Sequence, residues 1–328
     1  MSATLKIKKA SPGLDQRNRL GQLLGAGFDV EDYDPTRPLT AQVADADILL
    51  VRDVPITREV IDAAPRLKLI QRPGDHLPRI DLEHARSRRI PVSRFPAKVQ
   101  QLPAGDVAEH AFHLLLSLAK QQWLSRRSVK QRKTGLPKTI SVRGKTLGLV
   151  GLGNTGEALA KLAVPFGLRV IAVKRSADPD LARSLGLAWL GTMDRLAELL
   201  AESDFVSLHL PQTAETVDLL DATQLQQMKR GAYIINISRA PMLNRHALLA
   251  ALQSGHLAGA GVDVWWEEPA DPADPLLAFP NVLLTPHIAA DTAETELRLA
   301  ELTADNVQRV ARGESPRYVV GIDVDAGK

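Results

Sequence analysis

One segment, residues 146–176, limits the possible folds of this chain more than any other feature. An apolar run at 146–150 leads into a glycine-rich turn at 151–156, and a helical pattern from about residue 155 to 164 precedes a second apolar run at 168–173. This order of strand, tight turn, helix and strand is typical of a βαβ unit, in which the two strands lie parallel in one sheet. The segment therefore predicts an α/β fold.

The three glycines of the turn have separate physical roles. Gly151 permits a tight turn at the strand end, Gly153 lets the backbone approach a pyrophosphate, and Gly156 lets the helix pack close to the strand. The first helical residues, Asn154 and Thr155, belong to the turn where free amides and the positive end of the helix dipole face the phosphates. We therefore expect these five residues to bind a dinucleotide; the alternative is a βαβ unit that holds no ligand.

The residues after the second strand indicate which dinucleotide binds. A carboxylate near this point usually binds the ribose hydroxyls of NAD, whereas a basic residue can accept the 2′-phosphate of NADP. Here Lys174, Arg175 and Ser176 follow the strand, and the first acid is Asp178. The sequence predicts that NADP is preferred and NAD is possible, with Arg175 at the 2′-phosphate and Lys174 solvated beside it.

Composition excludes several kinds of site. The chain has 328 residues, enough for two domains, and no cysteine, which excludes disulfides, thiolate metal sites and thiol nucleophiles. No run approaches the ~20 apolar residues of a membrane helix. Residues 1–10 carry three lysines and lack the apolar core of a secretory signal. We therefore expect a cytoplasmic location, no membrane partner and no metal site.

Net charge gives little support for a nucleic-acid partner. The net charge is +3, and the basic run at 126–133 has no recognition motif beside it. We interpret this run as a solvated helix end and loop, and expect no binding of nucleic acid.

Strand and helix patterns alternate through most of the chain, which indicates parallel sheets joined by crossover helices. Short apolar runs before the glycine turn predict a small α/β domain, with strands at 47–51, 67–70 and 90–92. A long helical pattern at 104–127 follows and is suited to bridging two domains. Later strands are expected at 205–208, 233–237, 260–264 and 282–285, then a helix at 293–312 and a closing strand at 317–320.

Polar residues follow or end each of the four later strands. They are His209, Arg239, Asp263 with Glu268 beyond it, and His287. Ligands of an open parallel sheet bind beyond the carboxyl ends of its strands, so these side chains are candidates for one site beside the glycine turn. Each residue alone has an ordinary interpretation: a loop or core histidine, a surface ion pair, or an acidic turn.

The chemistry of this set suits the reduction of a ketone. Hydride transfer to a ketone produces an alkoxide that needs a proton, which an imidazolium can give while a nearby carboxylate keeps the imidazole charged. A guanidinium can hold a substrate carboxylate through two parallel hydrogen bonds and polarise a carbonyl. Arginine, glutamate and histidine around a nicotinamide therefore suggest a 2-oxo acid substrate.

With these residues in this order, the chain resembles the D-isomer-specific 2-hydroxyacid dehydrogenases, in particular glyoxylate and hydroxypyruvate reductases. The similarity covers nearly the whole chain and is strongest at 149–156, 203–211, 235–239, 261–269 and 285–288. The resemblance implies that Arg239 binds substrate, His287 is the acid/base and Glu268 is its partner. It also implies that Asp263 meets the nicotinamide carboxamide. The cofactor-binding residues expected at 203–211 are His209 and Pro211.

The resemblance also implies the domain organisation. It predicts two Rossmann-like or flavodoxin-like domains with doubly wound parallel sheets and an active site in the interdomain cleft. Residues 1–103 plus 292–328 form the substrate-binding lid, and residues 104–291 form the dinucleotide-binding domain. Members of the family are usually dimers joined through the cofactor domains, so we expect a homodimer, with the basic loop after Arg126 at that contact.

The chain departs from the family pattern at some positions. Ala240 replaces the glycine that often follows the Ser-Arg pair, which is a small change. Trp265 and Trp266 are bulkier than the usual residues and either shape the active-site wall or simply pack in the core.

The lid loop departs as well. The segment that normally offers backbone amides to the substrate carboxylate aligns with Gly74, Asp75 and His76, which we expect to contact substrate. Asp75 would repel an anion if it pointed inward, so we expect it to point outward. Gln100 and Gln101 lie in another divergent stretch and are further candidate substrate contacts.

The sequence therefore predicts an oxidoreductase that transfers a hydride between NAD(P)H and a small 2-oxo acid, with glyoxylate and hydroxypyruvate as first candidates. One alternative is a non-catalytic NAD(P)-sensing scaffold or co-repressor of the same fold, against which the intact Arg239, Glu268 and His287 argue. Another is formate or phosphite oxidation, but formate enzymes of this shape have a glutamine where Glu268 stands.

Overall fold

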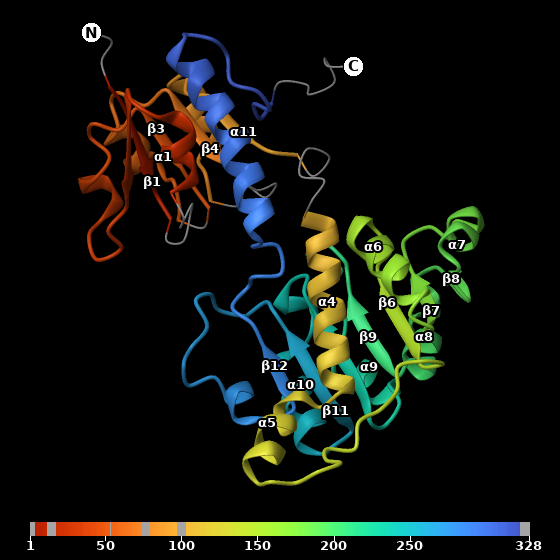
Figure 1. Cartoon of the computed structure of the whole chain (residues 1–328). Helices are drawn as coiled ribbons and strands as arrows, with labels where there is room; N and C mark the ends of the chain where they lie inside the picture. Colours follow the sequence, from red (N-terminus) through yellow and green to blue (C-terminus); the bar gives the residue numbers. More distant parts are fainter. Residues whose placement is uncertain (1–3, 12–17, 53, 74–78, 97–102, 322–328) are drawn as a thin grey trace. The chain divides into compact units, whose positions relative to one another are not determined.

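The computed structural model describes residues 4–11, 18–52, 54–73, 79–96 and 103–321. The chain forms two compact units, each with its own sheet (Figure 1). The first unit comprises Met1–Leu102 and Ala293–Lys328, and the second comprises Pro103–Thr292. The roles of these units as lid and cofactor domain stay predictions.

The first unit contains a five-stranded parallel sheet. Its strands are β1 (Leu5–Lys9), β2 (Phe28–Asp32), β3 (Ile48–Leu50), β4 (Leu69–Arg72) and β5 (Val92–Arg94). Their order, β2-β1-β3-β4-β5, is that of flavodoxin-like folds. β1 and β2 were not expected, because lysines interrupt the apolar pattern of β1. Two of these lysines, Lys8 and Lys9, form ion pairs of 2.8 and 3.0 Å with Glu31 and Asp32 of β2. Acidic residues of the neighbouring strand therefore compensate the positive charges of β1.

Helices cover both faces of this sheet. They are α1 (Arg19–Leu24), α2 (Arg58–Asp62), α3 (Leu82–Ser87) and α11 (Ala293–Ala311), with a short 3₁₀ turn, η1 (Leu39–Ala41). On one face, Ile7, Ile48 and Leu69 of the sheet pack against Leu20 of α1 and Val307 of α11. Figure 1 shows α1 and α11 side by side on this face. The sheet is therefore buried on both sides, as expected for parallel strands.

The second unit contains a seven-stranded parallel sheet in the order β12-β11-β10-β9-β6-β7-β8. Its strands are β6 (Thr146–Val150), β7 (Arg169–Val173), β8 (Trp189–Gly191), β9 (Phe205–Leu208), β10 (Ala232–Asn236), β11 (Leu257–Val262) and β12 (Val282–Leu284). The order reverses at β6, which is the arrangement of a dinucleotide-binding Rossmann sheet. The two parallel sheets confirm the predicted doubly wound α/β class.

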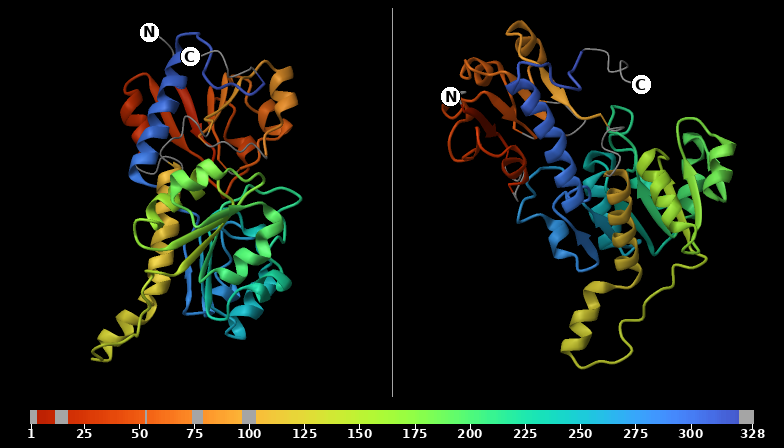
Figure 2. Two further views of the ribbon diagram at one scale, coloured as in Figure 1. Left: turned by 90° about the vertical axis from the view of Figure 1, so that its right-hand side faces the viewer. Right: turned by 45° about the horizontal axis from the view of Figure 1, so that its top comes forward.

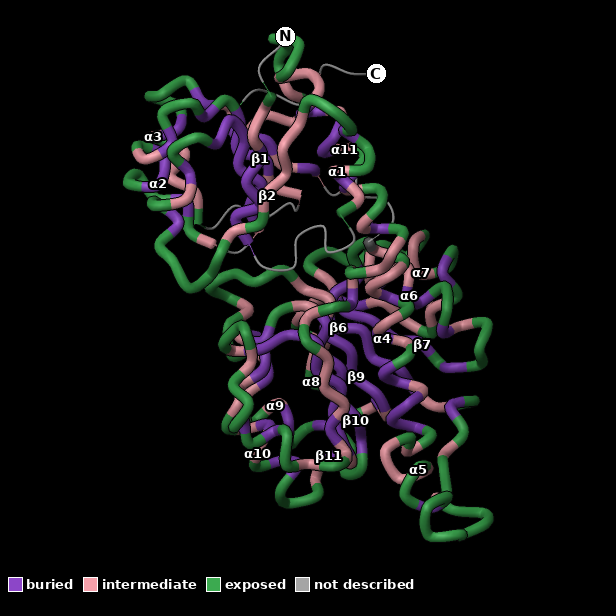
Figure 3. Tube along the Cα trace, turned by 60° about the vertical axis from the view of Figure 1, so that its left-hand side comes forward, coloured by how far each residue is buried: buried purple, intermediate pink, exposed green. Residues whose placement is uncertain are grey.

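Helices also flank the second sheet, and two apolar cores lie on its opposite faces. The helices are α4 (Pro103–Ala119), α5 (Gln122–Lys130), α6 (Asn154–Ala163), α7 (Pro179–Leu185), α8 (Leu196–Glu202), α9 (Ala222–Gln227) and α10 (Arg245–Gln253), with 3₁₀ turns η2 (Met193–Arg195), η3 (Ala240–Met242) and η4 (Pro275–Ala278). β6, β9 and β10 are buried along their whole length, whereas the region around α5 is mostly exposed (Figure 3). α5 and the segment after it extend away from the rest of this unit (Figure 2).

Two expected elements differ from the structure. The helix expected at 104–127 is two helices, because the chain turns at Gln121, whose φ of 46° is left-handed. The closing strand expected at 317–320 is wrong: only an isolated bridge joins Val319 to Ser93. The backbone of Arg317 instead binds side chains, since its N–H donates to Asn306 Oδ1 at 2.7 Å and its carbonyl accepts from Ser93 at 2.7 Å.

Within the described ranges, no helix is both long and apolar enough to cross a membrane.

Candidate active site

The glycine turn is held by close contacts that leave no room for side chains at two positions. Gly151 has a φ of +100°, and a Cβ there would lie 2.7 Å from the carbonyl oxygen of His209. A Cβ on Gly156 would lie 2.6 Å from the carbonyl oxygen of Gly151. Both distances are too short for a real Cβ, so the close packing of β6, α6 and the end of β9 requires glycine here.

Gly153 differs because it faces open space. A Cβ added there would meet no atom within 4 Å among the described residues. Gly153 is also the N-cap of α6, and no described side chain caps the helix, so the amides of its first turn, which includes Asn154 and Thr155, are not satisfied from within the helix. An open backbone surface beside an uncapped helix N-terminus fits the phosphates of a dinucleotide.

The end of β7 lies beside this turn, because Val173 pairs with Val150 of β6. Lys174, Arg175 and Ser176 follow directly, and Arg175 is exposed. The first acid, Asp178, caps α7: its carboxylate accepts hydrogen bonds from the amides of Asp180 and Leu181 at 3.0 and 3.1 Å. One oxygen of the first carboxylate after this strand is therefore engaged in capping α7.

His209 follows β9 and packs against the glycine turn. Both of its ring nitrogens are buried and have no hydrogen-bond partner among the described residues. Burial lowers the pKa of this imidazole to about 3, so the ring is neutral. A buried unpaired polar group is costly, and a bound cofactor would supply the missing partner. Pro211, two residues on, accepts a hydrogen bond from the Thr216 hydroxyl at 2.9 Å through its carbonyl.

Arg239 lies just beyond β10, and a buried asparagine holds the chain there. The Asn236 side chain donates to the carbonyl of Arg239 at 3.0 Å, and its oxygen accepts from the amide of Ser238 at 3.1 Å. The Arg239 side chain is exposed and donates to the carbonyl of Ser238 at 2.6 Å. Asn236 therefore fixes the backbone that carries Arg239, and the guanidinium stays exposed.

Glu268 and His287 form a contact pair from two neighbouring strand ends. Nδ1 of His287 lies 2.9 Å from both carboxylate oxygens of Glu268, and the Trp265 amide donates to Glu268 Oε1 at 3.2 Å. The hydrogen bond to Glu268 raises the pKa of His287 against the opposing effect of burial. Burial raises the pKa of Glu268, but the hydrogen bond and charge of His287, the Trp265 amide and Arg239 outweigh it and lower the pKa.

The buried carboxylate of Asp263 supports the loop that carries His287. It accepts hydrogen bonds from the Thr285 hydroxyl at 2.6 Å and from the amides of Ile288 and Ala289, both at 2.9 Å. These bonds surround His287, which has a left-handed φ of 57°. The structure thus shows Asp263 as an anchor of this loop; its expected contact with the nicotinamide stays a prediction.

His110 of α4 is a part of this network that the sequence did not reveal. Its Nε2 lies 3.0 Å from the Thr285 hydroxyl and 3.6 Å from Asp263. The single hydroxyl proton of Thr285 goes to the carboxylate, so Nε2 of His110 must donate to the hydroxyl. Burial lowers the pKa of His110 against the charge of Asp263, which raises it. The helical apolar pattern around His110 gave no signal of this contact.

The predicted set comes together only in part within the described residues. Arg239, Glu268 and His287 follow β10, β11 and β12, which are adjacent in the sheet, and the charge of Arg239 lowers the pKa of both partners. The expected substrate contacts Gly74, Asp75 and His76, and the candidates Gln100 and Gln101, lie outside the described residues. No group of three or more His, Asp or Glu side chains in the described ranges is placed to hold a metal ion.

Comparison with known proteins decides the family. The family model "D-isomer specific 2-hydroxyacid dehydrogenase, NAD binding domain" matches residues 112–289. The chain belongs to this family. A glyoxylate reductase of Korarchaeum cryptofilum is 38% identical over 286 residues, covering 85% of this chain and 83% of the relative. A glyoxylate reductase of Thermococcus litoralis is 36% identical over 313 residues, covering 90% and 92%.

Solved structures agree with this assignment. The apo structure of D-lactate dehydrogenase from Escherichia coli has a TM-score of 0.85 at 26% identity, and covers 96% of this chain and 100% of that chain. The TT0316 protein from Thermus thermophilus has a TM-score of 0.80 at 35% identity, and covers 96% and 99%. The dehydrogenase is therefore an oxidoreductase that acts on the CH–OH group of 2-hydroxy acids, or on the matching 2-oxo acids, with a nicotinamide cofactor.

The pair of Glu268 and His287 leads to a prediction about proton affinity. In a Glu268→Gln variant the carboxylate charge is lost, so we expect the pKa of His287 to fall, which can be followed by NMR titration of the histidine Cε1–H resonance. The pKa of His287 in the folded protein is raised above its ordinary value in the unfolded chain. The Glu268–His287 pair therefore contributes its full free energy of folding at a pH below the ordinary pKa. This contribution is lost as the pH rises through the raised pKa of the folded protein. An unchanged His287 titration would show that the contact does not control the proton.

Proposed function

We propose that this dehydrogenase reduces small 2-oxo acids, with glyoxylate and hydroxypyruvate as first candidates, and prefers NADPH. The observation that carries the proposal is the Glu268–His287 contact beside Arg239, at the edge of the sheet that also bears the glycine turn. The names of the glyoxylate reductase relatives support the choice of first substrate. The exposed Arg175 and the occupied Asp178 support the choice of cofactor.

The residues then have separate tasks. Arg239 binds the substrate carboxylate through paired, charge-assisted hydrogen bonds and polarises the keto group. The proposed proton donor is the protonated form of His287: Nδ1 is held by Glu268, so Nε2 is the atom that would give its proton to the developing alkoxide. Glu268 keeps the imidazole in this orientation and charge state. The nicotinamide, when bound, supplies the hydride to the keto carbon.

We propose that Gly151, Gly153, Asn154, Thr155 and Gly156 bind the pyrophosphate. Lys174, Arg175 and Ser176 would hold the phosphorylated ribose, and His209, Pro211 and Asp263 the rest of the cofactor. The open face at Gly153 and the unpaired ring of His209 support this assignment within the part of the chain that the structure describes.

The first unit is proposed to be the substrate-binding lid. Gly74, Asp75 and His76 of this unit would offer groups to the substrate carboxylate. Support comes from the family resemblance and from solved dehydrogenases that match 96% of the chain, both units included.

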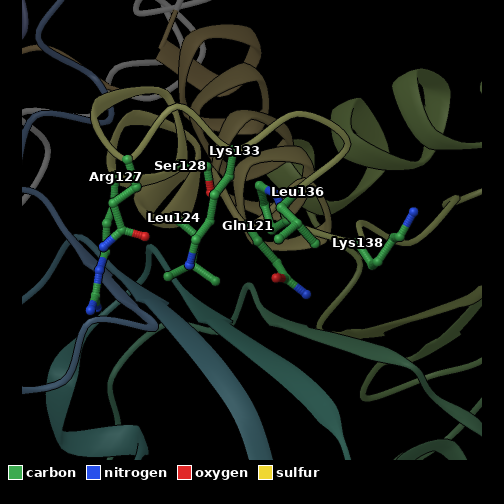
Figure 4. A pocket seen from close by; sticks show the side chains of 9 residues that line it. Gln121, Leu124, Arg127, Ser128, Lys133, Leu136 and Lys138 are labelled. Carbon is green, nitrogen blue, oxygen red and sulfur yellow. The ribbon is translucent and has the colours of Figure 1, made fainter.

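We also propose a homodimer joined through the cofactor domains. Support comes from the extended arm formed by α5 and the segment after it. Val129 and Leu136 on this arm are 76% and 48% exposed. A hollow of about 480 Å³ lies between α5 and the returning chain, with Leu124 and Leu136 among its lining residues (Figure 4). Exposed apolar side chains on such an arm are suited to burial against a second copy.

The cofactor preference gives a prediction in numbers. A charge-assisted hydrogen bond is worth about 1.5–3 kcal/mol, which corresponds to a preference for NADPH of about 10–100-fold in kcat/KM. An Arg175→Ala variant should lose most of this preference through weaker use of NADPH alone. Arg183→Ala is the matched control, because Arg183 is an exposed arginine on α7 paired with Asp180. Comparable kcat/KM values for NADH and NADPH in the parent protein would rule out the preference.

The catalytic roles are tested by two substitutions with different expected readouts. His287→Ala should abolish reduction of every 2-oxo acid in a panel, while NADPH fluorescence shows that the cofactor still binds.

Arg239→Met should raise the KM for glyoxylate by roughly tenfold or more, since it removes charge-assisted bonds to the carboxylate. Turnover near the parent rate in the first variant, or an unchanged KM and kcat in the second, would show that the role is misassigned.

A further inference from the structure

Two adjacent tryptophans follow β11, and their indole groups make different hydrogen bonds. Nε1 of Trp265 donates to the carbonyl of Thr285 at 2.9 Å. Nε1 of Trp266 donates to the carbonyl of Leu243 at 3.1 Å. The two acceptors lie in loops after different strands, because Leu243 follows β10 and Thr285 follows β12.

The sheet order explains how one dipeptide reaches both loops. β11 lies between β12 and β10, so the loop after β11 is bordered by the loops that follow these two strands. The pair therefore links the three strand ends that carry Arg239, Glu268 and His287.

The bond from Trp265 acts on the acid/base pair. Thr285 lies two residues before His287, and the intervening Pro286 has no N–H with which to fix the turn. The Trp265 indole holds this turn from the carbonyl side, while its backbone amide donates to Glu268 at 3.2 Å. Trp265 thus contacts Glu268 itself and the turn that leads to His287.

The bond from Trp266 acts on the other loop. Arg239 is the N-cap of η3, and Leu243 closes this turn by donating its amide to the carbonyl of Ala240 at 3.0 Å. By holding the Leu243 carbonyl, the Trp266 indole fixes the end of the turn opposite to Arg239.

We propose that Trp265 and Trp266 are positioning residues with separate effects: Trp265 orients Glu268 and His287 for proton transfer, and Trp266 orients Arg239 for substrate binding. The proposal rests on the proposed function, which assigns these tasks to the three residues. On this proposal, activity depends on the two indole N–H groups as well as on the size of the two rings.

The test compares Trp265→Phe and Trp266→Phe, which remove the indole N–H groups. From the usual worth of a neutral hydrogen bond, we expect Trp265→Phe to lower kcat for glyoxylate by about 5- to 10-fold and to move the alkaline limb of the kcat profile to lower pH. Trp266→Phe should raise the KM for glyoxylate by about 5- to 10-fold with little change in kcat.

Trp189→Phe is the matched control. Nε1 of Trp189 is buried but has no hydrogen-bond partner among the described residues, so this variant removes a similar ring volume without breaking a bond. Both kcat and the KM for glyoxylate should stay within about twofold of the parent, since no bond is lost. If the two test variants behave like this control, or if each lowers kcat and raises KM alike, the proposal is overturned.

A second measurement does not depend on turnover. In hydrogen exchange followed by mass spectrometry, Trp265→Phe should speed exchange in peptides that cover 286–289, and Trp266→Phe in peptides that cover 240–245. If the parent protein reduces no 2-oxo acid, the proposed function fails, while exchange still shows whether each indole holds its loop. Should a Phe variant not fold, replacing the indole by its benzothiophene isostere removes the N–H and keeps the size. Unchanged exchange in both loops would overturn the proposal.

Discussion

The candidate site depends on the buried carboxylate of Asp263. A buried charge is costly unless several donors surround it, and here the donors are the Thr285 hydroxyl and the amides of Ile288 and Ala289. These bonds also hold His287 in a left-handed conformation that non-glycine residues rarely adopt. The cost of burying the charge and the cost of this backbone conformation are thus offset by the same hydrogen bonds. Any change that freed Asp263 would release the loop that carries His287.

The charges of the site are coupled in a way that suits an anionic substrate. In the free protein the charge of Arg239 lowers the pKa of His287, in opposition to Glu268. On the proposed function, a substrate carboxylate bound to Arg239 would offset this effect, because opposite charges at close range compensate each other. The imidazole would then hold its proton most firmly when substrate is present. The arginine would thus both recognise the acid and link its arrival to the protonation of His287.

Features encoded locally were predictable from the sequence, and features formed by long-range contacts were not. The glycine turn and the residues after each strand were readable because their spacing follows from a parallel sheet. His110 was missed because its partner, Thr285, lies 175 residues further along the chain. Asn236 is an exception: its contacts with Ser238 and Arg239 are local, but they depend on a side-chain orientation that spacing alone does not give. The break at Gln121 was missed because the residues on both sides favour a helix. β1 was missed because its lysines pair with acids of β2.

The acid that follows β7 shows how cofactor choice depends on local structure as well as composition. A carboxylate serves a ribose only if its oxygens are free to accept the hydroxyls. Asp178 is near in sequence, but one of its oxygens caps α7, a helix that begins with Pro179. Counting acids within a few residues of the strand would therefore mislead. On the proposed function, Lys174 and Arg175 are the charges after the strand that meet the ligand, and two cations there would favour a phosphate over a hydroxyl.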